Sequence, residues 1–186
     1  NGVDPLHVFN GTDIWNAGLA APSAPSISDG GAGNLPADDY SVVITYYDSA
    51  TGLESSASTP DTLTLGASKK ITVSWSAYSG EHPSTAVRVY VRQDSNQTEH
   101  FLVATIATGT TTYDINLTQD QLDALTVLAP DEDINDPPIS ALIGVQTHVS
   151  RLFAHNGSRI YYSNLDQPEA WDPDNYFTLN ADDGQK

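Results

Sequence analysis

The chain has 186 residues, with 24 acidic and seven basic side chains and a formal net charge of −17. This acidic excess argues against binding to a nucleic-acid backbone, because such binding depends on lysine and arginine. The sequence contains no cysteine, which excludes disulfides, thiolate chemistry and cysteine-based zinc sites. It has no run of about 18 apolar residues either, so it does not predict a membrane-spanning helix.

The composition predicts an all-β protein, since 13 glycines and 11 prolines accompany many Thr, Ser, Val and Tyr residues. Residues 1–19 predict a strand, a tight turn at Asn10-Gly11 and a second strand. Residues 20–36 are dense in proline and glycine, and we interpret them as a linker. The ends at Asn1 and Lys186 carry no terminal signature, so we expect a piece of a longer polypeptide.

Residues 37–128 predict a β-sandwich of the immunoglobulin-like class, because short β-branched and aromatic runs recur about every ten residues with polar turns between them. The predicted strands are 40–47, 62–65, 71–76, 86–92, 100–106 and 111–115. One short helix is predicted at 118–125, with Thr118 as N-cap and Gln121 closing a capping box.

Residues 129–140 are acidic and bounded by prolines, which predicts a second linker. Residues 141–186 resume a β pattern with a hairpin that turns at Asn156-Gly157. After the hairpin, Pro168 and Pro173 predict a loop anchored by Trp171, because proline removes backbone donors from a ladder. We expect residues 1–19 to pack with residues 141–186 while the sandwich stands apart.

Three segments of the sandwich resemble fibronectin type III domains. Residues 35–55 resemble strands F and G of that family, while residues 71–75 and 87–92 resemble strands B and C. Since the F-like and G-like segment comes first, the resemblance implies a circularly permuted domain.

The chain ends carry a second resemblance, at Asn1–Asp4, Phe9–Thr12, Arg151–Phe153, Tyr162-Ser163, Pro168 with Trp171, and Asp183–Lys186. These motifs resemble β-propeller structural proteins of tailed bacteriophages, in the tail-nozzle and DNA-stabilisation class near the portal. The resemblance implies a virion protein of the tail, bound to other virion proteins or to copies of itself, with the sandwich inserted in a propeller-like part.

Three aromatic residues are candidates for surface recognition: Trp171, Tyr161 and Tyr176. The alternative for Trp171 is a purely structural anchor. Hard oxygen ligands for calcium could come from carboxylates in the acidic linker and after Trp171, although neither group has the glycine and terminal glutamate of a helix–loop–helix calcium site. These carboxylates are Asp131, Asp133, Asp136, Asp172 and Asp174.

The functional hypothesis is a non-enzymatic virion component that assembles through β-rich interfaces, with no cofactor and no membrane or nucleic-acid partner. It rests on the absence of any converging catalytic set, since neither a nucleophile elbow nor a phosphate-cradling loop occurs in the sequence. The alternative is a secreted or cell-surface carbohydrate-binding module, stabilised by calcium, with the three aromatic candidates stacking on sugar rings.

Overall fold

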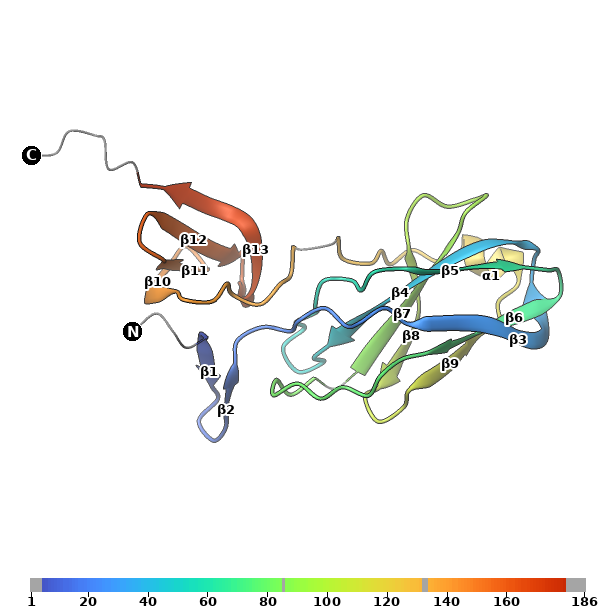
Figure 1. Cartoon of the computed structure of the whole chain (residues 1–186), viewed down its shortest axis with the longest axis horizontal. Coiled ribbons are helices and arrows are strands. Elements are labelled where there is room, and N and C mark those ends of the chain that lie inside the picture. Colours follow the sequence, from blue (N-terminus) through green and yellow to red (C-terminus); the bar gives the residue numbers. More distant parts are fainter. Residues whose placement is uncertain (1–4, 85, 132–133, 180–186) are drawn as a thin grey trace, which may run out of the picture.

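The computed structural model describes residues 5–84, 86–131 and 134–179. The described chain is built from antiparallel strands with one short helix, as predicted. The strands form four sheets: one of two strands, one of three and two of four. The two middle sheets lie at one end of the molecule and the two terminal sheets at the other (Figure 1).

The middle of the chain forms a β-sandwich-like unit, which we call the sandwich. One sheet has the order β3–β6–β9 and the other the order β5–β4–β7–β8. The strands are β3 (Ser26–Leu35), β4 (Asp38–Tyr47), β5 (Asp61–Leu65), β6 (Lys69–Ser74), β7 (Ala86–Gln93), β8 (Phe101–Ala107) and β9 (Thr112–Ile115).

Alternating apolar side chains fill the space between these two sheets. Val42 and Ile44 of β4 and Val89 of β7 meet Ile71 and Val73 of β6 in one buried cluster. Because side chains alternate between the faces of a strand, these positions point to a common core. The two sheets are therefore held together mainly by apolar burial.

The predicted helix is confirmed as α1 (Gln119–Asp123). The side chain of Thr118 accepts a hydrogen bond from the backbone N–H of Gln121, and Oε1 of the Gln121 side chain accepts one from the backbone N–H of Thr118. Leu122 buries this single turn against the sandwich core. No helix in the described part of the chain is long and apolar enough to cross a membrane.

The interpretation of 20–36 as a linker is wrong for most of its length, because residues 26–35 form β3 and pair with β6. Two of the glycines that suggested a linker, Gly30 and Gly33, have a packing role instead. A Cβ on Gly33 would lie 2.5 Å from the backbone oxygen of Lys69, so only glycine fits that approach. The register of β3 shifts twice near these glycines, which marks irregular strand pairing.

The terminal parts of the chain form the other two sheets. The N-terminal hairpin pairs β1 (His7–Phe9) with β2 (Ile14–Asn16), and the predicted turn joins them. The terminal sheet is a meander in the order β10–β11–β12–β13. Its strands are β10 (Ile143–His148), β11 (Arg151–His155), β12 (Arg159–Asn164) and β13 (Gln167–Thr178).

The hairpin predicted at Asn156-Gly157 is confirmed between β11 and β12, with Gly157 at φ +100°. The loop predicted after it is wrong, because Pro168 and Pro173 both lie within β13. Strand β13 is at the edge of its sheet. A proline there costs no inter-strand hydrogen bond when its nitrogen faces away from β12, because no strand lies on that side. Register shifts along β12 and β13 accommodate the irregular segment.

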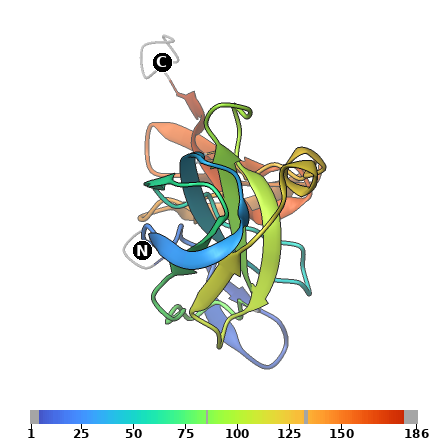
Figure 2. The same cartoon turned by 90° about the vertical axis from the view of Figure 1, so that its right-hand side faces the viewer.

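The two chain ends pack together, and the sandwich does not stand apart from them. Leu6, before β1, packs on the terminal sheet. Leu19 forms a buried cluster with Leu53 of the sandwich and Ala170 of β13. The described part of 129–140, which is 129–131 and 134–140, contains no strand, but Asp136 exchanges two backbone hydrogen bonds with Trp171. Figure 2 shows the terminal sheet behind the sandwich along the long axis.

Candidate functional site

The outer face of the terminal sheet is the main candidate for an interaction surface. Strand pairing and alternation place eight side chains on this face, because directly paired residues point to the same side. They are Gln146 and His148 of β10, Arg151, Phe153 and His155 of β11, Ile160 and Tyr162 of β12, and Phe177 of β13.

Four rings form a continuous row across this face, one from each strand. The ring centroids of His148 and Phe153 are 6.2 Å apart, those of Phe153 and Tyr162 are 5.8 Å apart, and those of Tyr162 and Phe177 are 5.2 Å apart. The guanidinium of Arg151 lies 5.2 Å from the centroid of Tyr162. Since neighbouring rings and Arg151 flank Tyr162, this row suits packing against protein better than stacking of a free sugar.

Apolar side chains around the row remain open to solvent. Phe177 is 56% exposed, and Ile143, which pairs with His155 at the opposite edge, is 45% exposed. Next to Phe153 and Ile160 lies a hollow of about 380 Å³. Large exposed apolar groups gathered on one surface mark an interaction site more often than scattered ones do.

The inner face of the terminal sheet holds the three aromatic residues predicted for recognition. Trp171 is 2% exposed and Tyr161 is 5% exposed, in a cluster with Ala154. The indole Nε1 of Trp171 donates a hydrogen bond of 2.9 Å to the carbonyl oxygen of Pro168. Tyr176 packs on Tyr161, with ring centroids 5.4 Å apart. The structure thus places Trp171 and Tyr161 in a core rather than on a binding surface.

The calcium candidates do not converge where the structure describes them. Asp133 lies outside the described residues, and the others form no group of three potential metal ligands. The Asp172 carboxylate instead accepts a hydrogen bond from the backbone of Asp174, a local turn contact. Asp136 bonds to Trp171 through its backbone.

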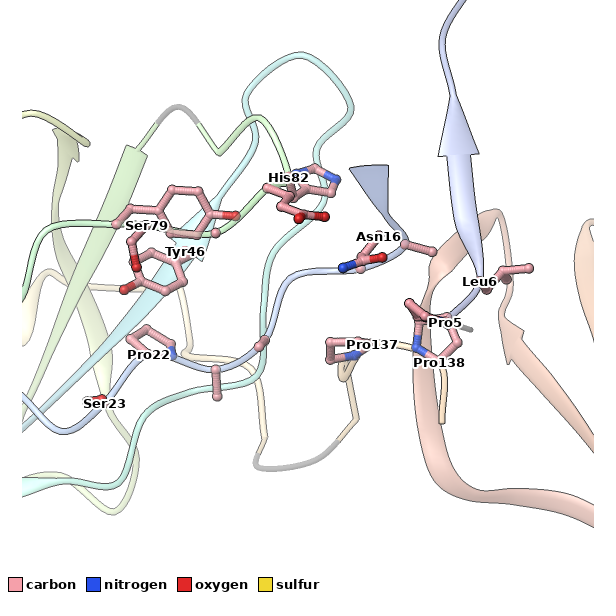
Figure 3. Close-up of a pocket in the computed structure, with 17 residues that line it drawn as sticks. Pro5, Leu6, Asn16, Pro22, Ser23, Tyr46, Ser79, His82, Pro137 and Pro138 are labelled. Carbon is pink, nitrogen blue, oxygen red and sulfur yellow. The ribbon is translucent and has the colours of Figure 1, made fainter. Parts of the chain in front are cut away.

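A second feature is a cleft of about 460 Å³ where the sandwich meets the chain ends (Figure 3). Tyr46 and Tyr78 line its sandwich side, and their rings contact edge to face at 4.6 Å. Burial raises the pKa of Tyr78 to about 12, so its hydroxyl stays protonated at neutral pH. Pro137 and Pro138 line the opposite side.

A partly buried carboxylate beside this cleft joins three parts of the chain. Glu169 Oε2 lies 3.1 Å from the backbone nitrogen of Gly18, 3.4 Å from Trp15 Nε1 and 3.2 Å from His82 Nε2. Burial alone would raise the pKa of Glu169, but the contacts with His82, Gly18 and Trp15 outweigh it and lower the pKa below its ordinary value. The geometry is that of a structural tie.

His82 is 4% exposed, and its ring contacts Trp15 edge to face with centroids 5.6 Å apart. The contact of Nε2 with Glu169 is close but does not have the direction of a regular hydrogen bond, and Nδ1 has no hydrogen-bond partner among the described residues. The ring therefore depends on its carboxylate neighbour and on packing.

Ser41 and His100 form a pair with the composition of a nucleophile and a base. Ser41 Oγ lies 2.9 Å from His100 Nε2, but Ser41 is only 1% exposed. Burial, helped by the charge of Arg92 and opposed by Asp94, lowers the pKa of His100 to about 4. A covered hydroxyl cannot reach a substrate in this arrangement, so we interpret the pair as a structural hydrogen bond.

Glu54 organises another polar cluster on the sandwich. Its carboxylate accepts hydrogen bonds from Thr45 Oγ1 at 2.6 Å and from Tyr90 OH and Arg88 Nη1 at 2.5 Å each. The Arg88 guanidinium also stacks 3.5 Å from the ring centroid of Tyr47. All these groups fix the loop after β4 against β7, which is a structural role.

Comparison with known proteins gives no match, either to a protein-family model or to a curated protein. The outer face of the terminal sheet was missed by the sequence reasoning, which concentrated on Trp171. The hairpin sequence does indicate this face. A turn at Asn156-Gly157 fixes the register of the two strands, and in that register Phe153 and Tyr162 lie opposite each other.

Proposed function

We propose that this chain is a non-enzymatic structural component of a larger β-rich assembly, and that the assembly is the tail or nozzle of a tailed bacteriophage. The observation that carries the proposal is the outer face of the terminal sheet. One face of this sheet is buried on Leu6 and Ile139, whereas the other presents a row of rings to solvent. A sheet packed on one side only, with aromatic residues on the other, is suited to bury that side against another protein layer.

The shape of the terminal sheet supports the propeller-like interpretation. Its four strands follow one another as an antiparallel meander, the arrangement of a single propeller blade. A blade carries apolar side chains on both faces, as this sheet does: its inner face is covered by Leu6 and Ile139 of the same chain, and its outer face is open to a partner. In this proposal the partners are copies of the chain or other virion proteins.

The strand neighbours in the sandwich support a permuted fibronectin type III-like domain inserted into that part. In immunoglobulin-like folds, strands A, B and E share one sheet and strands C, F and G share the other. If β6 is B and β7 is C, the observed orders β3–β6–β9 and β5–β4–β7 reproduce A–B–E and G–F–C. Strand β8 then lies beside C, where an added C′ strand belongs. Strands F and G precede B in the chain, as the sequence resemblance implies. Strand β3, in the place of A, comes before both of them, so the chain order is A–F–G–B–C–C′–E, which is a rearrangement of the family's order but not a circular permutation of it.

The polar clusters of the sandwich favour a structural role over catalysis. Ser41 is covered, His100 is held neutral, and Glu54 accepts hydrogen bonds from three donors. A catalytic group needs access to a substrate as well as a suitable pKa. The carbohydrate-binding alternative loses support because Trp171 and Tyr161 are buried.

Immunogold electron microscopy tests this proposal. Antibodies raised against the purified chain are applied to the virus particles or cells that encode it, with the same serum preabsorbed on the chain as the control. We expect gold at the portal end of phage tails. Gold on a bacterial cell surface instead would contradict the virion assignment and favour the carbohydrate-binding alternative.

A further inference from the structure

We propose that the outer face of the terminal sheet binds the N-terminal hairpin of a second copy of this chain, so that copies join head to tail. This inference names the partner within the assembly proposed above and rests on that proposal. The contact is heterologous, meaning that it joins two different surfaces of the same protein.

The N-terminal hairpin carries an exposed apolar pair. Phe9 and Ile14 are directly opposite each other in the register, and they are 65% and 68% exposed. The turn between them is held by Asn10, whose side chain accepts hydrogen bonds from the backbone of Thr12 and Asp13 at 2.9 and 2.8 Å. An ordered tip with two exposed apolar side chains can bind without a large loss of conformational entropy.

The hollow on the terminal sheet offers an apolar surface for this tip. Phe153 and Ile160 form its floor with Gly144, where a register shift opens the pairing of β10 with β11. Gly144 has φ +60°, and a Cβ there would meet only the His155 ring, at 3.6 Å. The hollow is open and mainly apolar, with Gln146 and His155 as its polar lining, which suits a compact pair such as Phe9 and Ile14.

Charge also favours this pairing of surfaces. None of the eight side chains of the outer face is Asp or Glu, although the chain carries a net charge of −17. Arg151 adds a positive charge to the face. The hairpin tip carries Asp13, which is exposed. Two acidic copies repel each other at long range, so a face without carboxylates is the favourable place for contact.

The contact requires a second copy because of how the hairpin is oriented. Figures 1 and 2 show the loop between β1 and β2 pointing away from the terminal sheet of its own chain. In a series of such contacts, each copy binds one neighbour through its hairpin and the other neighbour through its terminal sheet. Repetition closes into a ring or continues as a filament, depending on the rotation at each contact.

Disulfide trapping tests the contact directly, because the sequence has no cysteine of its own. Two variants of the whole chain are prepared, Thr12→Cys on the hairpin and Gln146→Cys on the sheet, each with a different affinity tag. They are then mixed under mildly oxidising conditions. Thr98→Cys on the exposed surface of the sandwich replaces Gln146→Cys in the control. We expect at least about tenfold more mixed disulfide for Thr12–Gln146 than for Thr12–Thr98, since an interface raises the effective concentration. Equal yields would overturn the inference.

Sedimentation velocity over a range of concentrations gives the second measurement. The variant Phe9→Ser/Ile14→Ser is compared with the matched variant Val127→Ser/Leu128→Ser, which removes exposed apolar groups at the edge of the sandwich beside β8. We expect the hairpin variant to weaken association about tenfold or more while the control does not. A strictly monomeric wild type, or association that is unchanged in the hairpin variant, would overturn the inference. Tail labelling by immunogold decides the proposed function separately, so either proposal can fail alone.

Discussion

His82 Nε2 and Glu169 Oε2 lie 3.2 Å apart, and their contact links the sandwich to the terminal sheet at a buried position. The same carboxylate oxygen also lies within hydrogen-bonding distance of Trp15 Nε1 and the backbone of Gly18, on the N-terminal segment. One side chain thus ties together three parts of the chain that are far apart in the sequence. It acts at this junction together with the buried cluster of Leu19, Leu53 and Ala170.

The substitution Glu169→Gln tests this tie. It keeps the shape of the side chain but removes the charge, and we expect a loss of about 1–3 kcal/mol in the free energy of unfolding. Urea unfolding at pH 7 measures the loss. Glu99→Gln, at an exposed position, is the matched control and should change stability by less than about 0.5 kcal/mol. Equal effects of the two substitutions would show that the tie contributes nothing.

Wild type and Glu169→Gln should also differ in how their stability depends on pH. The pKa of Glu169 is lowered in the folded state from its ordinary value of 4.5, so the unfolded chain takes up a proton first as the pH falls. The stabilisation by the carboxylate is complete above about pH 4.5 and is lost as the pH falls through the folded pKa. The stability difference between wild type and Glu169→Gln should therefore shrink on acidification. Urea unfolding at several pH values between 7 and 3 measures this, and a constant difference would contradict it.

Gly18 lies where the N-terminal segment passes the linker and β13. Its φ is +85°, and a Cβ would lie 2.6 Å from Pro137 Cα and 2.7 Å from the backbone oxygen of Glu169. We expect Gly18→Ala to cost about 3 kcal/mol or more, because left-handed strain and a backbone clash act together. Gly11→Ala is the control, since Gly11 has φ +101° with nothing within 4 Å of its Cβ position. It should cost only about 1–2 kcal/mol in thermal unfolding, and equal costs would refute the close packing at Gly18.

The sequence predicted the features of this fold that depend on local chemistry. The strands of the sandwich follow from alternation in runs such as Val42–Tyr46, and α1 follows from the reciprocal hydrogen bonds of Thr118 and Gln121. The turns at Asn10 and Gly157 follow from backbone preferences. Each of these signals is contained in a few neighbouring residues.

The features that were missed depend on partners distant in the sequence. Gly33 belongs to a strand because it lies against the backbone of Lys69, and Pro168 lies in a strand because β13 is an edge. Trp171 is buried because Leu6 and Ile139 cover the inner face of the terminal sheet. Composition alone cannot distinguish such positions from loops. The candidate surface on the opposite face could be found only after strand register was known.

His100 provides a last prediction, at mildly acidic pH. Burial lowers the pKa of its imidazole from 6.5 to about 4, beside Ser41. In the unfolded chain the ring takes up a proton near pH 6.5, so stability due to the neutral ring is present above that pH and is lost on going down to about pH 4. After allowance for solvent screening, we expect this to amount to about 1–2 kcal/mol.

The substitution His100→Gln removes the titration while leaving a polar side chain near Ser41. The stability advantage of wild type over this variant should narrow between pH 7 and pH 4 in urea unfolding. A parallel NMR titration should show the His100 ring still neutral at pH 5.5, where a free imidazole is mostly protonated. An imidazole that titrates near 6.5 in the folded protein, together with an unchanged stability difference, would show that His100 is open to water and that Ser41 is more accessible than its burial indicates.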